Sequence, residues 1–90
     1  MKELHETARF RRDCRKIERG GSGKAQRNLA AAIELLMHDS ALPPEFRDHG
    51  LSGNWAGFRD CHIGPDLLLI YKTTPTTVYL TRLGSHSELF

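Results

Sequence analysis

The chain has 90 residues, of which 39% are hydrophobic and 27% charged, and its formal net charge is +2. A chain of this length closes around one hydrophobic core, so we expect a single domain over residues 1–90, and the composition excludes disorder of the whole chain. The basic excess is local, because residues 1–41 hold nine Lys or Arg against six Asp or Glu, whereas residues 42–90 hold four against five.

The cysteines and the apolar runs indicate the compartment. Cys14 and Cys61 are too few for a disulfide framework and neither belongs to a CxxC pair, so both are expected to be small, reduced core residues. The segment MKELHETARF lacks the apolar run of a secretory signal, and the longest apolar stretch, Leu67–Tyr71, is too short to span a bilayer. We therefore expect a cytoplasmic protein that does not enter a membrane.

The first nineteen residues predict an edge strand followed by a helix. The mixed segment KELHE at residues 2–6 is a candidate first strand. Thr7 is a suitable N-cap, and apolar residues follow it at the i, i+4, i+7 spacing of one helix face, at Phe10, Cys14 and Ile17. The predicted helix covers Thr7–Arg19.

The opposite face of this predicted helix is strongly cationic. At about 100° per residue, six basic side chains fall on it: Arg9, Arg11, Arg12, Arg15, Lys16 and Arg19. A solvated helix face is the commoner meaning of such a pattern, and a surface that binds a polyanion or an acidic protein is the alternative. The residues alone leave both interpretations open.

A second helix is predicted after the GGSG segment at residues 20–23, which is expected to be a flexible linker. An alanine-rich stretch repeats apolar residues at helical spacing, at Ala25, Leu29, Ile33, Leu36 and Met37. The helix is predicted over Ala25–His38, because Asp39 favours a turn and the Pro43-Pro44 pair prevents continuation. The two helices are expected to form a hairpin that covers a sheet.

The rest of the chain predicts β-strands. Three runs are rich in aromatic, β-branched and other apolar residues: Trp55–His62, Leu67–Thr73 and Thr76–Arg82. Their short connections predict an antiparallel meander, and the consecutive apolar residues of the middle run place it centrally with both faces covered. The predicted fold class is therefore α+β, an N-terminal helical hairpin packed on a small antiparallel sheet.

The meander brings titratable residues together at one edge of the sheet. The end of the first strand, the first turn and the end of the third strand share that edge, so four side chains should be neighbours there: His62, Asp66, Arg82 and His86. His49 precedes the first meander strand and would lie at the opposite end unless the loop at residues 43–53 folds back. Gly50 and Gly53 permit that path without requiring it.

Histidines beside a carboxylate and an arginine suit the cleavage of RNA phosphodiesters. One imidazole takes the proton of the 2′-hydroxyl, another gives a proton to the departing 5′-oxygen, and Arg82 stabilises charge on the phosphorane. This chemistry requires no metal and no cofactor. A positioned acid or base typically contributes about 10² to 10⁴ in rate, so a pair suffices for a useful nuclease.

Each of these residues also has a structural interpretation. A single histidine at a strand end, such as His62, is more often structural than catalytic, and Asp66 after Gly-Pro suits a turn. Arg82 could simply pair with Asp60 or Glu88, which contributes little stability if the pair is exposed. Taken singly, each residue is better explained structurally, and the catalytic hypothesis depends on their grouping.

A metal-dependent hydrolase that uses Cys61, His62 and Asp66 is a weaker hypothesis. Adjacent residues of a strand point to opposite faces, so Cys61 and His62 are not expected to share a metal ion. The chain also has no CxxC or HxxxH element that could complete a metal site. It has no Gly-rich phosphate loop and no GxSxG nucleophile elbow. We expect no bound metal.

Two segments carry a distinctive pattern at fixed spacing. They are RDHGLSGNWAGFRDCHIGPDLLLIYK at residues 47–72 and TRLGSHSELF at residues 81–90. Together they closely resemble the YafQ branch of the RelE/ParE superfamily of bacterial type II toxins, over most of residues 42–90. The resemblance implies a RelE-like microbial ribonuclease fold. It also implies a ribosome-dependent mRNA interferase that cuts messenger RNA in the ribosomal A site and is held inactive by a cognate acidic antitoxin.

Carried over position by position, the resemblance implies the site residues. The implied catalytic set is His49, His62, Asp66 and His86, with His86 as the proton donor. Asp60, Arg82 and Phe90 match positions associated with substrate binding. The resemblance further implies that the His49 loop folds back, and that the cationic helix face contacts ribosomal RNA or the antitoxin. The position after the Pro-Asp pair is tryptophan in many relatives and Leu67 here.

The main alternative is a non-catalytic module on the same fold. Superfamily members of the ParE type act on other targets, so the fold alone does not determine the function. In this alternative the basic helix binds RNA or protein and the histidines are structural. The histidine set discriminates between the two hypotheses.

Overall fold

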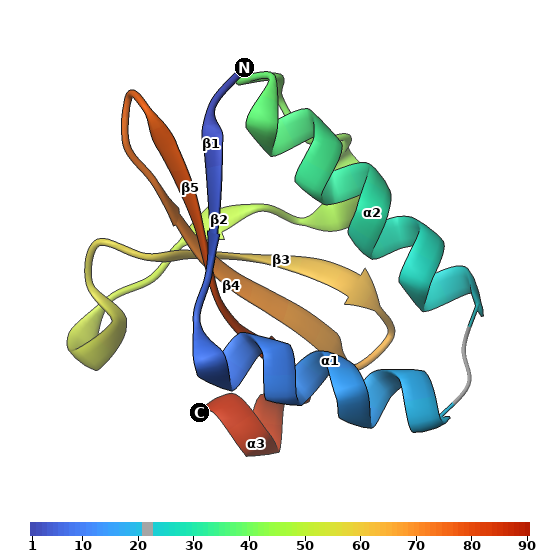
Figure 1. The fold of residues 1–90 in the computed structure, drawn as a ribbon. Coiled ribbons are helices and arrows are strands. Elements are labelled where there is room, and N and C mark those ends of the chain that lie inside the picture. Colours follow the sequence, from blue (N-terminus) through green and yellow to red (C-terminus); the bar gives the residue numbers. More distant parts are fainter. Residues whose placement is uncertain (21–22) are drawn as a thin grey trace.

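Five strands form one mixed sheet within residues 1–20 and 23–90, the parts of the chain that the computed structural model describes (Figure 1). The strands are β1 (Glu3–Glu6), β2 (His49–Gly50), β3 (Arg59–Gly64), β4 (Leu67–Thr73) and β5 (Thr77–Gly84). Their order across the sheet is β1-β5-β4-β3-β2, so the strand predicted to be central is central. Strands β3 to β5 form the predicted antiparallel meander. Strand β2 was not predicted, and it pairs antiparallel with β3.

The pairing of β1 makes the sheet mixed. The predicted edge strand lies parallel to β5, with Glu3 opposite Thr77 and Glu6 opposite Leu80. Short connections predict antiparallel neighbours, but these two strands are not joined by one. The chain that leaves β1 passes through both helices and three further strands before β5, and such a crossover permits parallel pairing. The α+β class is confirmed.

Two helices, α1 (Ala8–Gly20) and α2 (Gly23–Met37), follow β1 as the predicted pair (Figure 1). Both begin and end within two residues of the predicted bounds. Thr7 caps α1, because its hydroxyl accepts a hydrogen bond of 3.0 Å from the Phe10 amide. None of the helices in the described ranges is long and apolar enough to cross a bilayer.

The predicted GGSG linker is shorter in the structure than in the sequence pattern. Gly20 is the last residue of α1 and Gly23 is the first residue of α2. The two remaining linker residues, Gly21 and Ser22, lie outside the described residues.

The main core lies between the helices and one face of the sheet. Its buried members are Phe10, Ala32, Leu36, Phe46, Cys61, Ile63, Leu69, Tyr71, Val78, Leu80 and Leu83. A smaller cluster on the other sheet face packs Leu51, Trp55 and Phe58 against Leu68, Ile70 and Leu89. Strand β4 is therefore buried on both faces, as its apolar run predicted. Leu67, at the position of the relatives' tryptophan, packs half-buried against the main core.

The first meander strand begins later than predicted. The predicted range was Trp55–His62, whereas β3 spans Arg59–Gly64 and the segment Gly53–Trp55 forms a short 3-10 helix, η2. Gly57 takes a φ of +91°, a conformation that interrupts an extended strand and that glycine alone adopts easily. The third strand is also displaced, from the predicted Thr76–Arg82 to Thr77–Gly84.

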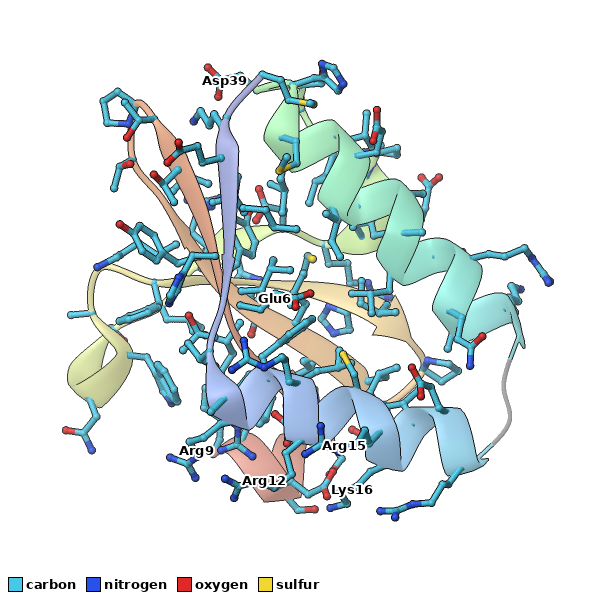
Figure 2. All side chains as sticks on the ribbon, viewed as in Figure 1. Glu6, Arg9, Arg12, Arg15, Lys16 and Asp39 are labelled. Carbon is cyan, nitrogen blue, oxygen red and sulfur yellow. The ribbon has the colours of Figure 1, made fainter. Side chains whose placement is uncertain are left out.

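The cationic face predicted for the first helix is exposed on α1. Figure 2 shows four of its side chains extending from the lower side of the helix, away from the sheet: Arg9, Arg12, Arg15 and Lys16. Phe10 is buried on the packed side, and Cys14 and Ile17 contact the main core. The predicted division of this helix into a packed face and a cationic face is confirmed.

A largely buried ion pair joins α1 to β5. Asp13 accepts hydrogen bonds from Nε of Arg82 at 2.9 Å, from Nη2 of Arg82 at 3.3 Å and from the Leu83 amide at 2.9 Å. Strand β1 ends opposite Leu80, so the Leu83 amide lies beyond the reach of that neighbouring strand. Asp13 therefore satisfies a buried amide as well as a guanidinium, and fixes α1 on the sheet.

Replacing Asp13 by alanine leaves both of these donors without their acceptor. We expect the free energy of unfolding, measured by urea denaturation, to fall by about 2 to 4 kcal/mol. Glu18→Ala removes an exposed carboxylate of the same helix and should change it by less than about 0.5 kcal/mol. An Asp13→Ala protein as stable as the Glu18→Ala control would contradict this role.

Candidate active site

Four of the predicted site residues lie in two cross-strand rows on the sheet face opposite the main core. Directly opposed residues of neighbouring strands point to the same face. One row, next to the β3–β4 turn, contains His62, Leu68 and Gly84. The adjacent row contains His49, Asp60, Ile70 and Arg82. The register of the sheet therefore gathers residues from four strands on one surface.

His86 and Asp66 form a hydrogen-bonded pair beside the first row. The short helix α3 (His86–Leu89) begins with His86 directly after β5 and Ser85, and Asp66 lies in the β3–β4 turn. Asp66 Oδ1 accepts a hydrogen bond of 3.1 Å from the His86 amide and lies 3.2 Å from the imidazole Nδ1. These bonds hold the pKa of Asp66 below its ordinary value. Because Nδ1 faces the carboxylate, Nε2 is the nitrogen that can give a proton to another molecule.

The imidazole of His62 is the next ring along this edge. Its centroid lies 6.0 Å from that of His86. His62 Nδ1 is buried and has no hydrogen-bond partner among the described residues, an arrangement that is costly in a core and recurrent in functional sites. The structure thus brings His62, Asp66 and His86 together, as the meander predicted.

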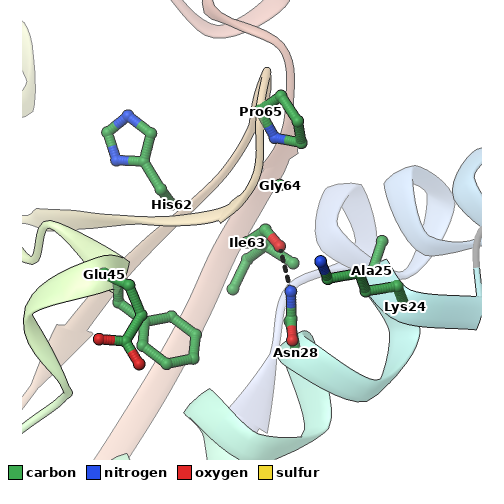
Figure 3. Close-up of a pocket in the computed structure, with 9 residues that line it drawn as sticks. Lys24, Ala25, Asn28, Glu45, His62, Ile63, Gly64 and Pro65 are labelled. Atoms are coloured by element: carbon green, nitrogen blue, oxygen red, sulfur yellow. Dashed lines mark hydrogen bonds between the residues drawn. The ribbon is translucent and has the colours of Figure 1, made fainter.

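A hollow of about 480 Å³ adjoins His62 at the edge of β3 (Figure 3). It lies between β3, α2 and the short 3-10 helix η1 (Pro44–Phe46). Asn28 of α2 donates a hydrogen bond of 2.9 Å to the Ile63 carbonyl, which fastens the helix to this edge. His62 is thus one of the residues that line this hollow.

His49 joins the same surface through a fold-back of the chain. Strand β2 pairs antiparallel with β3, so that His49 lies opposite Asp60, and the resemblance-based expectation of a fold-back is met. Of the two glycines that permit this path, Gly53 takes a positive φ, +63°, in the returning loop. The meander alone does not determine this path, and the β2–β3 pairing does.

The His49 ring is oriented by two oxygens. Its Nδ1 lies 2.8 Å from the Arg47 carbonyl and 3.2 Å from Asp60 Oδ1. A carbonyl accepts and cannot donate, so the short contact requires a proton on Nδ1 and leaves Nε2 of the neutral ring as a proton acceptor. The Asp60 contact has the distance of an ion pair but not the geometry of a hydrogen bond, since Asp60 Oδ1 has no hydrogen-bond partner among the described residues.

Asp60 is the buried carboxylate of the site, with a side chain only 4% exposed. Burial raises its pKa, and the nearby imidazoles of His49, His62 and His86 act in the opposite direction. A buried carboxylate within range of three imidazoles stabilises the positive charge of any of these rings that takes up a proton.

Arg82 and Phe90 occupy the rim of the same surface. Arg82 lies in the Asp60 row, and its partner is Asp13, not Asp60 or Glu88 as the structural interpretation allowed. The ion pair uses Nε and Nη2 of the guanidinium. The exposed Phe90 ring lies 6.2 Å from that of His86, so His62, His86 and Phe90 form a series of three rings.

A second carboxylate, Asp48, supports the strand that carries His49. Arg59 donates to both of its oxygens at 3.2 Å, and the Tyr71 hydroxyl donates to Oδ1. Burial and the Asp48 carboxylate raise the pKa of Tyr71, so the phenol stays protonated as a donor. This network ties β2 to β3 and β4. The Asp-His pair in the sequence was noticed for its histidine, and the role of Asp48 was missed.

A capping box holds α3 in place and was also missed. The Ser85 hydroxyl accepts from the Glu88 amide at 3.3 Å, and Glu88 Oε1 accepts from the Ser85 amide at 2.9 Å. The other carboxylate oxygen of Glu88 accepts from Lys16 Nζ of α1 at 2.9 Å. The Ser-x-x-Glu spacing at residues 85–88 is a known start signal for a helix and could have predicted α3.

Neither cysteine belongs to this site. Cys61 is buried in the main core, on the opposite side of β3 from His62, and burial raises its pKa to about 12. Cys14 packs against the same core and has its pKa raised to about 11. No group of three His, Cys, Asp or Glu side chains in residues 1–20 and 23–90 is placed to hold a metal ion. The geometry therefore does not support the hydrolase hypothesis that joined Cys61, His62 and Asp66 around a metal.

Comparison with known proteins identifies the family. The family model described as "Bacterial toxin of type II toxin-antitoxin system, YafQ" matches residues 2–90. The mRNA interferase toxin YafQ of Escherichia coli strain K12 is 40% identical over 68 residues, which cover 74% of each protein. A copper-bound mutant toxin from Helicobacter pylori is 40% identical with a TM-score of 0.92 over the whole of both chains.

A chain of the E. coli DinJ–YafQ complex is 30% identical with a TM-score of 0.89, and the match covers all of this chain and 99% of that one. Fold and sequence together define a bacterial toxin of a type II toxin–antitoxin system. Within that class, the chain belongs to the YafQ family. The resemblance inferred from residues 47–72 and 81–90 is confirmed, and the match extends over almost the whole sequence.

The Glu88 carboxylate makes the anchoring of α3 sensitive to acid. Hydrogen bonds from the Ser85 amide and Lys16 lower its pKa to about 2. A carboxyl with a folded-state pKa below its unfolded value stabilises the fold above that unfolded value, and the contribution is lost as the pH falls. Glu88→Gln keeps the capping hydrogen bond but cannot ionise. We expect the free energy of unfolding of this variant to fall less than that of wild type between pH values of about 4.5 and about 2.

The measurement is the free energy of unfolding by urea at a series of acidic pH values. Glu45→Gln, a change of an exposed carboxylate on η1, serves as the matched control and should keep the wild-type acid dependence. Superimposable pH curves for Glu88→Gln and wild type would contradict the assigned contribution.

Proposed function

We propose that this chain is an mRNA interferase, the toxin of a type II toxin–antitoxin pair, and that it cleaves ribosome-bound messenger RNA by metal-independent acid–base catalysis. The observation that carries the proposal is the His86–Asp66 pair, in which the His86 ring centroid lies 6.0 Å from that of His62, beside the surface that holds His49 and Asp60. A relative of 40% identity bears the name mRNA interferase toxin, which supports the substrate class.

In the proposed reaction His49 is the general base. Its Nδ1 faces the Arg47 carbonyl, so Nε2 of the neutral ring can accept the proton of the 2′-hydroxyl. The 2′-oxygen then forms a bond to phosphorus. The imidazolium that results lies 3.2 Å from Asp60, whose carboxylate offsets the new charge.

His86 is the proposed general acid. Asp66 accepts from the Nδ1 side, which directs Nε2 toward the substrate, and the proton on Nε2 passes to the departing 5′-oxygen as the phosphorus–oxygen bond breaks. The products are an RNA ending in a 2′,3′-cyclic phosphate and an RNA beginning with a 5′-hydroxyl. His62, between the two, stabilises the phosphorane by hydrogen bonding.

Arg82 and Phe90 are proposed to bind the substrate around the reacting phosphate. Asp13 fixes the orientation of the Arg82 guanidinium, whose Nη1 takes no part in the ion pair and would face the phosphate. The exposed Phe90 ring beside His86 provides a surface on which a base can stack.

The proposed partners are a cognate acidic antitoxin and the ribosome. A similar E. coli chain occurs in a complex with DinJ, which supports an antitoxin partner. The exposed arginines of α1 would contact ribosomal RNA phosphates without reading sequence, or receive an acidic antitoxin segment. We expect these partners to be met in the cytoplasm.

Substitution of His86 by alanine tests the catalytic proposal directly. We expect ribosome-associated mRNA cleavage to fall by about 10² to 10⁴-fold, the usual contribution of a positioned proton donor. His38→Ala changes an exposed histidine on the turn after α2 and should leave the rate unchanged. Cleavage by His86→Ala at the wild-type rate would refute the assignment.

A triple variant separates the proposal from a non-catalytic binding module. If the histidines are only structural, a protein with His49, His62 and His86 all changed to alanine should act on its target as wild type does. We expect this variant instead to release no RNA with a 2′,3′-cyclic phosphate end, as judged by end-group analysis of the fragments.

Chelation tests whether a metal takes part. The H. pylori relative was crystallised with copper bound, so a metal requirement is a specific alternative that chelation can test. We expect cleavage of messenger RNA by purified toxin on ribosomes to be unaffected when the toxin is first treated with a strong chelator and then exchanged into the assay buffer. A loss that returns on adding one specific metal would overturn metal independence.

A further inference from the structure

A third cross-strand row lies on the same sheet face as the candidate active site. Lys72 of β4 is opposite Tyr79 of β5, and Tyr79 is opposite His5 of β1. Phe58, which directly precedes β3, lies on the other side of Lys72. We call Phe58, Lys72, Tyr79 and His5 the aromatic row. It continues the series formed by the His62 row and the Asp60 row.

The aromatic row holds a cation between two rings. Lys72 Nζ lies 5.3 Å from the centroid of Phe58 and 5.4 Å from that of Tyr79. The outer ends are extended by edge-to-face contacts, Trp55 with Phe58 at 5.3 Å and His5 with Tyr79 at 5.5 Å. No carboxylate oxygen of a described residue forms an ion pair with Lys72 within 4.0 Å. The positive charge is therefore available to a ligand.

The distance from the catalytic residues is that of a neighbouring subsite. Residues of one face are two positions apart along a strand, so adjacent rows are separated by about 7 Å. The aromatic row then lies about 13 Å from the His62 row, by the same rise per residue. Leu68 and Ile70, the β4 members of the two histidine rows, are covered by Leu51, Trp55, Phe58 and Leu89. An RNA strand would therefore pass outside this cluster to reach Lys72 and Tyr79.

We propose that the aromatic row is a second RNA-binding site, which holds single-stranded RNA flanking the cleaved phosphodiester. Bases stack on Phe58 and Tyr79, and Lys72 contacts the phosphate between them. Aromatic platforms that alternate with cations are the usual means of binding single strands without sequence preference. This inference rests on the proposed function, because it assigns part of the substrate of that same site.

The chemistry of the row favours RNA over an acidic peptide. A peptide carboxylate would pair with Lys72, but it offers no flat ring to stack on the half-buried Phe58 and Tyr79. A nucleotide supplies the anion and the flat ring together. The row accordingly predicts that binding depends on the bases as well as on the charge.

The chain provides its own reporter for this test. Trp55 is the single tryptophan of the sequence and contacts Phe58. We expect an unstructured oligoadenylate added to the full-length protein to quench the Trp55 fluorescence. Inorganic polyphosphate, which has the charge but no bases, should compete weakly and cause no quenching of its own.

We expect Lys72→Met and Tyr79→Leu each to raise the dissociation constant for oligoadenylate by about 10-fold. This is the change in affinity that the loss of one stacking contact produces. In ribosome-associated cleavage the same variants should raise KM and leave kcat within about twofold. Lys72→Arg keeps the cation over the rings and should restore binding. Arg27→Met, which removes an exposed charge from α2, is the matched control and should behave as wild type.

The outcomes separate this inference from the proposed function. Quenching that Lys72→Met and Tyr79→Leu abolish, in a protein that cleaves no RNA, would support the RNA site while refuting the nuclease. Normal cleavage with no quenching and an unchanged KM in both variants would refute the RNA site alone. Equal displacement by polyphosphate and oligoadenylate would show a simple charge effect and would also overturn it.

Discussion

The register of β3 against β4 is the constraint on which the rest of the structure depends. His62 is opposite Leu68 and Asp60 is opposite Ile70, so these residues face the active surface. Cys61 and Ile63 then point into the main core. A slip of one residue would exchange the two sets, so that a histidine and a carboxylate would point into the apolar main core and two apolar side chains would leave it. The packing of the core therefore selects the arrangement that also assembles the site.

The remaining site residues are attached to this register by polar contacts with the ends of the strands. Asp48 ties the segment before His49 to Arg59 and Tyr71, and β2 then sets His49 opposite Asp60. At the other end, Ser85 and Glu88 fix α3, and Lys16 joins it to the cationic helix α1. The Lys16–Glu88 ion pair thus connects the helix proposed to meet ribosomal RNA with the short helix that carries His86.

Much of this arrangement could be predicted from the sequence. Periodicity gave both helices within two residues, because their apolar spacing matches the packing that stabilises them. The meander placed His62 near Asp66 and His86, since antiparallel strands with short turns bring such positions to one edge. The strand β4 was predicted at its observed bounds, because an uninterrupted apolar run suits a strand buried on both faces.

Other features depended on interactions that no local pattern encodes. The parallel pairing of β1 with β5 and the Asp13–Arg82 ion pair join residues from opposite ends of the chain. The path of the His49 loop came only from the family resemblance, because glycines permit a fold-back without specifying it. The delayed start of β3 reflects the positive φ of Gly57, which composition could not reveal.

In the proposed reaction His86, paired with Asp66, supplies the proton to the leaving oxygen. The direct measurement is single-turnover cleavage on ribosomes of an RNA in which the 5′-oxygen at the cut site is replaced by sulfur. A thiolate departs without protonation, so a missing general acid no longer slows the reaction. We expect His86→Ala to cleave this RNA at nearly the wild-type rate, whereas His49→Ala should remain slow. A His86→Ala protein as impaired on the sulfur substrate as on the natural one would refute the role of His86 as general acid.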